Sequence, residues 1–228
     1  MKKKEAIRLY KFSDGKLILL VKEKVEFMRR DAAGFVPYGI TAANVTSLET
    51  SNNTFSNFIT DTESASDQTG ATTLKDNKAE QVRVEIRNVM ARAERKYGAG
   101  SAKYDKFGTQ TLSKQSDAEL LVTAKRVVRV GTTLLSELTA NGLTAAMLTA
   151  ITTLATEFET LLVDQQIKIS DRDIIQEDRV EMGNAIYTIL VDFCNTGRNI
   201  WETSDVAKYN DYIIYDTPTG EPLPPVTP

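Results

Sequence analysis

Residues 39–43, GITAA, recur as residues 142–146, GLTAA. On the N-terminal side of each block, residues 13–17, SDGKL, recur as residues 116–120, SDAEL. Both pairs of blocks are 103 residues apart. A constant offset across separated blocks is hard to produce by chance, so the chain is expected to hold two copies of one unit.

Two further blocks match at slightly different offsets. Residues 83–88, RVEIRN, match residues 179–184, RVEMGN, at an offset of 96. Residues 102–105, AKYD, match residues 207–210, AKYN, at an offset of 105. These offsets predict that a loop in the second copy is seven residues shorter, because loops tolerate such changes in length.

The sequence pattern of each copy predicts three helices. The first helix begins after Ser13 or Ser116, which are favoured N-cap residues, and Ser116 with Glu119 has the spacing of a capping box. Gly39 and Gly142 end this part of each copy with a turn. In every predicted helix the apolar residues recur at intervals of three or four, as a single buried face requires.

The expected fold is therefore all-α: a six-helix bundle made of two tandem, pseudo-symmetric three-helix repeats. Its expected parts are an N-terminal extension (1–12), repeat 1 (13–112), repeat 2 (113–212) and an extended proline-rich tail (213–228). We expect the copies to pack face to face in one bundle rather than as two small domains, because larger domains bury a greater share of their surface.

Three segments do not fit the helical pattern. Residues 63–78 are rich in Ser, Thr, Asp and Gly, which predicts a long loop or flexible crossover. Residues 6–12, AIRLYKF, and 212–215, YIIY, are rich in β-branched and aromatic side chains, as strands are. These two segments are expected to form short strands that pair with each other or with a neighbouring subunit, packed against the bundle.

The terminal segments also supply the candidate interface residues. Exposed strand edges recruit other strands, and a proline-rich tail can lie along a neighbouring molecule. The single tryptophan lies in a stretch found only in the second copy, where an interface residue and a core anchor are both open readings. The candidate interface residues are Ile7, Leu9, Tyr10, Phe12, Trp201, Tyr212, Ile213, Ile214, Tyr215, Pro224 and Pro225.

The residues that common catalytic and metal sites need are scarce. The chain has no histidine, which excludes histidine-based triads and histidine metal sites. Its single cysteine, Cys194, has apolar neighbours and is expected to be a small buried hydrophobe rather than a reactive thiol. Residues 171–173, DRD, predict the solvated start of a helix rather than a calcium site. Glu85 and Glu181 occupy matching positions and favour a structural polar network over paired catalytic carboxylates. We therefore expect no enzyme, cofactor or metal.

Charge is distributed unevenly along the chain. Residues 1–112 carry 19 basic and 14 acidic side chains, whereas residues 113–228 carry 9 and 17. Opposite charges of this kind favour contacts within one molecule or head-to-tail contacts between subunits, unless they only reflect drift after duplication. The isoelectric point of about 5.3 and the lack of a dense basic stripe disfavour nucleic-acid binding.

No targeting or membrane-spanning segment is expected. The basic start of the chain is followed by an apolar run at residues 17–21 that is shorter than a signal peptide needs. No run approaches the roughly 20 apolar residues that cross a bilayer. We therefore expect a cytoplasmic protein that does not bind membranes.

The C-terminal region resembles a known signature. Residues 202–218, with AKYNDY at 207–212 and YDTP at 215–218, resemble the C-terminal part of an uncharacterised family of bacterial all-helical proteins of about this length. The resemblance implies a helical fold and supplies no activity or ligand.

Taken together, these features favour a non-enzymatic structural or self-assembling helical protein that forms a homo-oligomer or a filament. The alternative is an adaptor that uses a groove between the two helical repeats to bind a peptide or helix. The partner is expected to be the protein itself or another protein.

Overall fold

The computed structural model describes residues 6–215, which form helices and connecting segments and contain no strand. The all-α prediction is confirmed. The chain divides into two compact units: unit 1 combines residues 1–61 with residues 173–228, and unit 2 comprises residues 62–172. The candidate interface residues Pro224 and Pro225 lie outside the described residues.

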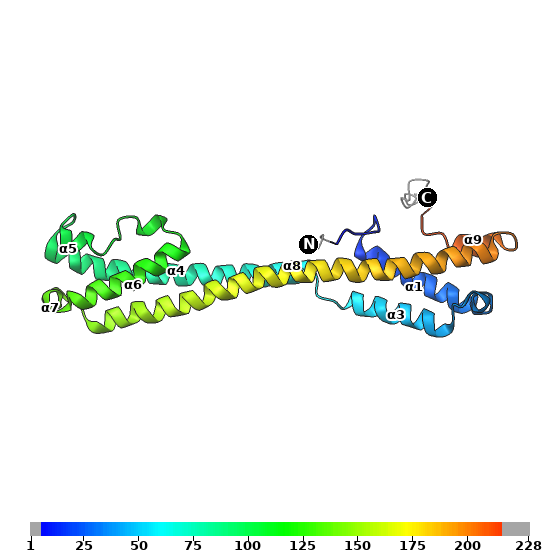
Figure 1. Cartoon of the computed structure of the whole chain (residues 1–228), viewed down its shortest axis with the longest axis horizontal. Helices are drawn as coiled ribbons and strands as arrows, with labels where there is room; N and C mark the ends of the chain where they lie inside the picture. Colours follow the sequence, from blue (N-terminus) through cyan, green and yellow to red (C-terminus); the bar gives the residue numbers. More distant parts are fainter. Residues whose placement is uncertain (1–5, 216–228) are drawn as a thin grey trace, which may run out of the picture. The chain divides into compact units, whose positions relative to one another are not determined.

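Unit 1 contains one helical hairpin, whose two arms are α1 and α3, and the C-terminal part of the longest helix. Figure 1 shows α1 and α3 beside the C-terminal part of α8. The elements of this unit are α1 (Asp14–Arg30), α2 (Ala32–Phe35), the 3₁₀ helix η1 (Val36–Tyr38), α3 (Ala42–Ser56), α8 (Ala145–Trp201) from residue 173 onward, and α9 (Val206–Asp211).

Unit 2 has the same kinds of element in a different chain order. Here the long helix α4 comes first, and the N-terminal part of α8 comes last. The elements are α4 (Asp61–Tyr97) from residue 62, α5 (Ala102–Asp105), η2 (Leu112–Lys114), α6 (Asp117–Thr133), α7 (Leu135–Leu138), η3 (Thr139–Asn141) and α8 up to residue 172.

The helix starts follow from local capping. The hydroxyl of Ser13 accepts a hydrogen bond from the backbone N–H of Lys16 at 3.2 Å. The backbone N–H of Ser116 donates to the carboxylate of Glu119 at 2.8 Å, and the Ser116 hydroxyl accepts from the backbone of Glu119. The predicted capping box is therefore confirmed. Gly142 has a φ of 86°, a left-handed conformation that favours glycine and lets the chain turn into α8.

Each unit has its own apolar core. In unit 1 the core joins α1, α3 and the C-terminal part of α8, with fully buried Leu17, Val21, Phe55 and Leu190 at its centre. In unit 2 the core joins α4, α6 and the N-terminal part of α8, and its fully buried residues include Ile86, Val89, Leu120, Val127, Ile151 and Phe158. Most apolar stripes predicted from sequence spacing are buried or half-buried faces of these helices. The stripe predicted for the third helix of the second copy is wrong, because Ala185 and Ile189 are exposed and Ile186 and Leu190 are buried instead.

The predicted loop at residues 63–78 is wrong, because this segment is part of helix α4. Its polar side chains find partners on other helices of unit 2. The amide of Gln165 donates to the hydroxyl of Thr72 at 2.8 Å, and the ammonium of Lys75 lies 2.6 Å from the carboxylate of Asp117. The polar composition predicted that this segment buries too little apolar surface to become ordered. Composition gives no information on polar contacts with a neighbouring helix, and such contacts are present here.

The predicted break between the second and third helices of the second copy is also absent. In the second copy, the expected second and third helices form the single 57-residue helix α8. Residues 171–173 therefore lie inside a helix, and the prediction that they begin one is wrong. The first copy does have a break, because α3 ends at Ser56 and α4 begins at Asp61.

The packing of the long helices does not follow the offset of 96. Arg179 in α8 forms an ion pair with Asp14 at 2.8 Å, and Lys75 in α4 forms an ion pair with Asp117 at 2.6 Å. Asp14 and Asp117 are the first residues of α1 and α6, so Lys75 and Arg179 have corresponding environments at an offset of 104. The buried residues agree, since Val82, Ile86 and Val89 correspond in this way to Ile186, Leu190 and Phe193. The repeat boundaries themselves stay a prediction, and each compact unit draws on both expected repeats.

The predicted terminal strands are wrong. Residues 6–12 lack regular secondary structure, and residues 212–215 follow helix α9 as an irregular segment. The β-branched and aromatic side chains of these segments pack against α8 instead of building a ladder of backbone hydrogen bonds.

Candidate functional site

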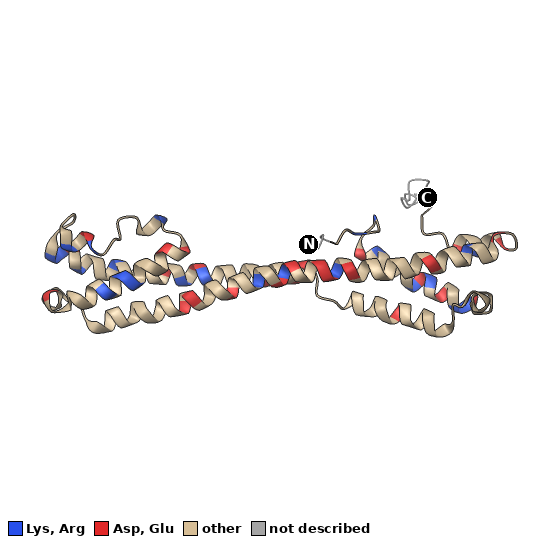
Figure 2. Cartoon of the chain, viewed as in Figure 1, with Lys and Arg blue, Asp and Glu red and all other residues tan. Residues whose placement is uncertain are grey.

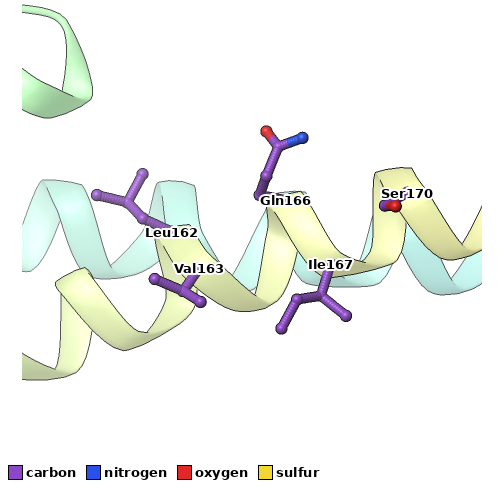
Figure 3. A pocket seen from close by; sticks show the side chains of 5 residues that line it. All are labelled: Leu162, Val163, Gln166, Ile167 and Ser170. Carbon is purple, nitrogen blue, oxygen red and sulfur yellow. The ribbon is translucent and has the colours of Figure 1, made fainter.

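An apolar face of α8 is exposed in unit 2. Val163 and Ile167 are 57% and 50% exposed, and both extend from the same side of the helix (Figure 3). Together with Leu162, Gln166 and Ser170 they line a shallow surface hollow of about 480 Å³. All five residues come from one helix, so this face has no second wall in the described part of the chain.

The opposite side of this part of α8 is polar. Arg172 donates to the side-chain oxygen of Gln68 at 3.2 Å, and Gln165 donates to Thr72. The apolar core of unit 2 reaches no further along α8 than Leu162. This stretch of α8 therefore contacts α4 partly through polar groups, while Val163 and Ile167 face solvent.

A second apolar hollow lies between α3 and α8 in unit 1. Thr50, Ser51 and Thr54 form one wall, and the other wall consists of Met182, Ala185, Ile186 and Ile189. The hollow measures about 250 Å³. A neighbouring hollow of about 480 Å³ shares Ile189 and is also lined by Asn44, Ser47, Leu48, Thr188, Asp192 and Phe193. We call the two hollows together the α3–α8 groove.

The N-terminal segment is held against α8 by one amide side chain. The oxygen of the Asn184 side chain accepts from the backbone N–H of Leu9 at 2.8 Å, and its NH₂ group donates to the backbone carbonyl of Ile7 at 2.8 Å. The side chains of Ile7 and Leu9 are 80% and 58% exposed. Two of the sequence-predicted interface residues are therefore on the surface of unit 1.

The predicted terminal segments do come together, through aromatic rings. The ring of Phe12 lies 5.4 Å from that of Tyr10 and 5.6 Å from that of Tyr215, measured between centroids. Tyr187 of α8 completes the cluster, 5.6 Å from Tyr10 and with its hydroxyl 3.3 Å from that of Tyr215. Tyr10 is buried and Phe12 and Tyr215 are half-buried, so this cluster tethers the two chain ends to unit 1.

Tyr212, another predicted interface residue, lies in the core of unit 1. Its ring is fully buried, and its hydroxyl donates to the Asp31 carboxylate at 2.9 Å. Arg30 and Lys208 lie 2.7 and 2.8 Å from the same carboxylate. Burial alone would raise the pKa of Asp31, but the hydrogen bonds from Arg30, Lys208 and Tyr212 outweigh burial and hold the pKa at about 2. This polar cluster therefore fixes α9 and the chain end.

Trp201 is half-buried at the end of α8. The ammonium of Lys208 lies 4.1 Å from the centroid of its ring, and the ring packs close to Gly34 and against the unit 1 core. The residues that follow Tyr212, Ile213 and Ile214, are also half-buried. The interface role of Trp201, Ile213 and Ile214 stays a prediction.

The titratable residues singled out from the sequence do not converge on one site. Cys194 is buried, as predicted, and desolvation raises the pKa of its thiol to about 12. Glu85 belongs to unit 2 and accepts from the Asn88 side chain at 3.4 Å, whereas Glu181 belongs to unit 1. The tyrosines of the matching AKYD and AKYN blocks, Tyr104 and Tyr209, lie in α5 and α9 and are half-buried. Within residues 6–215, no group of three or more Cys, Asp or Glu side chains is placed to hold a metal ion.

Helix α8 is long and apolar enough to cross a membrane by length and composition. Its most apolar 18-residue window has a mean hydropathy of 1.3, and 22% of that window is buried. The expectation that no segment approaches the required length is therefore wrong on this criterion. A helix that packs in a soluble bundle can have the same length and composition, so this feature does not distinguish the two environments.

Comparison of the chain with protein-family models, with curated proteins and with solved structures gives no match.

The sequence reasoning did not predict the exposed face of α8 or the α3–α8 groove. Val163 and Ile167 are four residues apart and lie off the main apolar stripe of α8, and this spacing was the available signal. On the α8 wall of the groove, the helical spacing of Met182, Ala185 and Ile189 predicts a buried face, so it does not indicate the groove itself. The groove depends on which helices become neighbours, because α3 and the second half of α8 are more than a hundred residues apart.

Proposed function

We propose that this protein is a non-enzymatic structural protein that assembles with copies of itself into a homo-oligomer or filament. The exposed apolar face of α8 around Val163 and Ile167 carries this proposal. Contiguous apolar side chains that a helix turns toward solvent are the usual mark of an interaction site, and covering them on association removes apolar surface from water.

Charge supports a contact between unlike surfaces of two copies. The described part of unit 1 has fourteen acidic and ten basic side chains, whereas unit 2 has fourteen acidic and fifteen basic. Unit 1 of one copy is therefore attracted to unit 2 of another more than two like units attract each other. A head-to-tail contact of this kind builds a ring if it closes and a filament if it does not.

We also propose that the two units descend from one duplicated element. In support, α1 and α6 begin and end 103 residues apart, and α3 and α8 begin 103 residues apart. Asp14 and Asp117 are 103 residues apart, and their ion-pair partners Arg179 and Lys75 are 104 residues apart, so the two ion pairs occupy corresponding places. On this reading each unit combines the first two helices of one copy with the third helix of the other.

Light scattering on the purified chain tests the assembly proposal. The monomer mass is 25.3 kDa, and we expect multiples of this mass to appear as the concentration rises into the micromolar range. High salt is expected to shift the equilibrium toward monomer, because screening weakens contacts between opposite charges. A constant mass of one chain at every concentration and salt level would refute the proposal.

A second candidate function is an adaptor that binds another protein. The α3–α8 groove favours it, because its walls come from the first and the second expected repeat and its floor is apolar. In this role the chain is a monomer that binds one defined helical segment. The groove, rather than the exposed face around Val163 and Ile167, would then be the working surface.

A further inference from the structure

The α3–α8 groove exists because unit 1 lacks side chains that close the corresponding place in unit 2. On α3, Ser51 corresponds at an offset of 103 to Leu154, a half-buried residue that packs against the core of unit 2. Thr54 corresponds in the same way to Glu157, whose carboxylate lies 2.8 Å from the ammonium of Lys78. Unit 2 is thus closed at this place by a leucine and an ion pair, which unit 1 does not have.

The other wall of the groove differs in the same direction. At the offset of 104 that relates α4 to α8, Met182 corresponds to Lys78 and Ile189 to Glu85. Unit 2 therefore has charged residues where unit 1 has Met182 and Ile189, and Ile189 is 39% exposed. Exposed apolar side chains are costly only where nothing covers them, so this difference indicates that the unit 1 surface is covered in use.

The rim of the groove is acidic on one side and uncharged on the other. Asp192 of α8 lines the groove, and no Lys or Arg lines either hollow. Figure 2 shows helix α3 almost entirely in tan, the colour of uncharged residues. Its one charged residue is Glu49, whose carboxylate is paired with Arg29 at 2.5 Å. A partner therefore meets apolar side chains at the floor, small hydroxyl groups on α3 and a carboxylate on α8.

From these observations we infer that the α3–α8 groove binds one amphipathic α-helix of a partner protein, with a short apolar stripe and Lys or Arg beside it. The groove follows α3 from Asn44 to Thr54, a length of about 15 Å or three helical turns. Ser47, Ser51 and Ala185 are small enough to let a helix backbone approach closely. The inference rests on the adaptor role and gives that role a site and a ligand class.

Charge disfavours this same groove of a second copy as the occupant. Two grooves placed face to face would bring Asp192 of each copy near the other, and the described part of unit 1 has an excess of acidic side chains. Like charges across an interface weaken it, whereas a basic helix gains from the same carboxylates. The helix-in-groove mode also matches the two-walled shape better than an extended strand does, because no sheet edge is available within residues 6–215.

The test uses the full chain and two fluorescent synthetic peptides of about 18 residues. Both have the same Leu and Ala stripe on one helical face, with Lys on the flanks of one peptide and Glu on the flanks of the other. Fluorescence anisotropy is expected to show that the Lys peptide binds at least about tenfold more tightly than the Glu peptide. Equal binding of the two peptides would overturn the inference.

Substitutions that place the corresponding unit 2 residues in the groove of unit 1 locate the binding site. Ile189→Glu and Ser51→Leu are each expected to weaken binding of the Lys peptide at least about tenfold. The first substitution adds negative charge, which would strengthen a merely electrostatic contact, so a loss of binding identifies the apolar groove. Because Ile189 is already partly exposed, the melting temperature of Ile189→Glu is expected to stay close to that of the parent protein.

The matched control is Val206→Glu. Val206 lies in α9 of the same unit and is 72% exposed, so this substitution makes the same chemical change away from the groove. It is expected to leave peptide binding unchanged. An equal loss in Val206→Glu and Ile189→Glu would overturn the inference. So would a loss of self-association in Ile189→Glu without any peptide binding, because a second copy would then be the occupant. If no peptide binds and Ile189→Glu still self-associates, the inference fails and the assembly proposal stands.

Discussion

At the scale of single residues, Asp31 shows how unit 1 holds the end of the chain. Its buried carboxylate accepts from Tyr212 and is paired with Arg30 and Lys208. A buried charge is tolerated only when its partners satisfy it. Lys24, also buried, donates to the backbone carbonyl of Asp211, so polar contacts at Asp31 and Asp211 hold the C-terminal segment in place of a strand.

The depressed pKa of Asp31 predicts a loss of stability in acid. A group whose pKa is lower in the folded state contributes stability above its unfolded pKa and loses it as the pH falls through the folded pKa. For Asp31 this window runs from about pH 4 down to about 2, and the loss is roughly 2 kcal/mol. Urea unfolding of the parent and of Asp31→Asn across this range measures it. Curves that stay parallel for the two proteins would show that Asp31 contributes nothing.

Gly197 and Gly70 predict opposite effects of the same substitution. A Cβ at Gly197 would lie 2.5 Å from Cγ of Tyr212, so Gly197→Ala displaces a buried ring and destabilises unit 1. A Cβ at Gly70 meets nothing within 4 Å, so Gly70→Ala is expected to stabilise helix α4 by about 0.5–1 kcal/mol. Thermal unfolding of both variants checks the pair. A stabilising effect of Gly197→Ala would contradict the close packing of the Tyr212 ring against Gly197.

The sequence could predict residues whose role is local. The caps at Ser13 and Ser116 and the burial of Cys194 follow from neighbours within a few positions. It could not assign Tyr212, because an aromatic residue near a chain end suits an interface as well as a core. Its burial depends on Asp31, which is 181 residues away.

At the scale of elements, helix α4 marks the limit of composition-based reasoning. Residues 63–78 have few apolar side chains, yet they form helix because α8 offers partners to Thr72 and Gln68. Local sequence also failed to show that the expected second and third helices of the second copy are continuous, as they are in α8. Helix existence was predictable from periodicity, whereas helix ends in polar stretches depended on tertiary contacts.

The polar packing of α4 predicts uneven local stability. Residues 62–74 are held mainly by polar contacts, whereas residues 79–93 belong to the apolar core of unit 2. Backbone amides in the first stretch should therefore exchange with solvent faster, because segments with few buried apolar contacts open at lower free energy. Hydrogen exchange with mass spectrometry resolves the two stretches. Equal protection along α4 would contradict this account.

At the scale of the whole molecule, most groups with strongly shifted pKa values lie where the terminal segments pack onto unit 1. Within residues 6–215 the titratable groups with large pKa shifts are Tyr10, Tyr187, Tyr212, Asp31, Arg30 and Cys194. Asp31, Arg30 and Tyr212 belong to the polar cluster that holds α9, and Tyr10 and Tyr187 to the aromatic cluster at the chain ends. The exposed face of α8 and the α3–α8 groove are two surfaces within residues 6–215 that a partner can cover.

If the exposed face of α8 drives self-association, as we propose, then Val163→Ser/Ile167→Ser must associate more weakly than the parent in sedimentation equilibrium. Val163 and Ile167 are each at least half exposed, so the double variant is expected to keep its melting temperature. We predict that the parent associates and that the double variant associates at least about tenfold more weakly, since each covered side chain contributes about 1 kcal/mol or more. A parent protein that sediments as a single 25.3 kDa chain at all concentrations, or a double variant that associates as strongly as the parent, would contradict the claim.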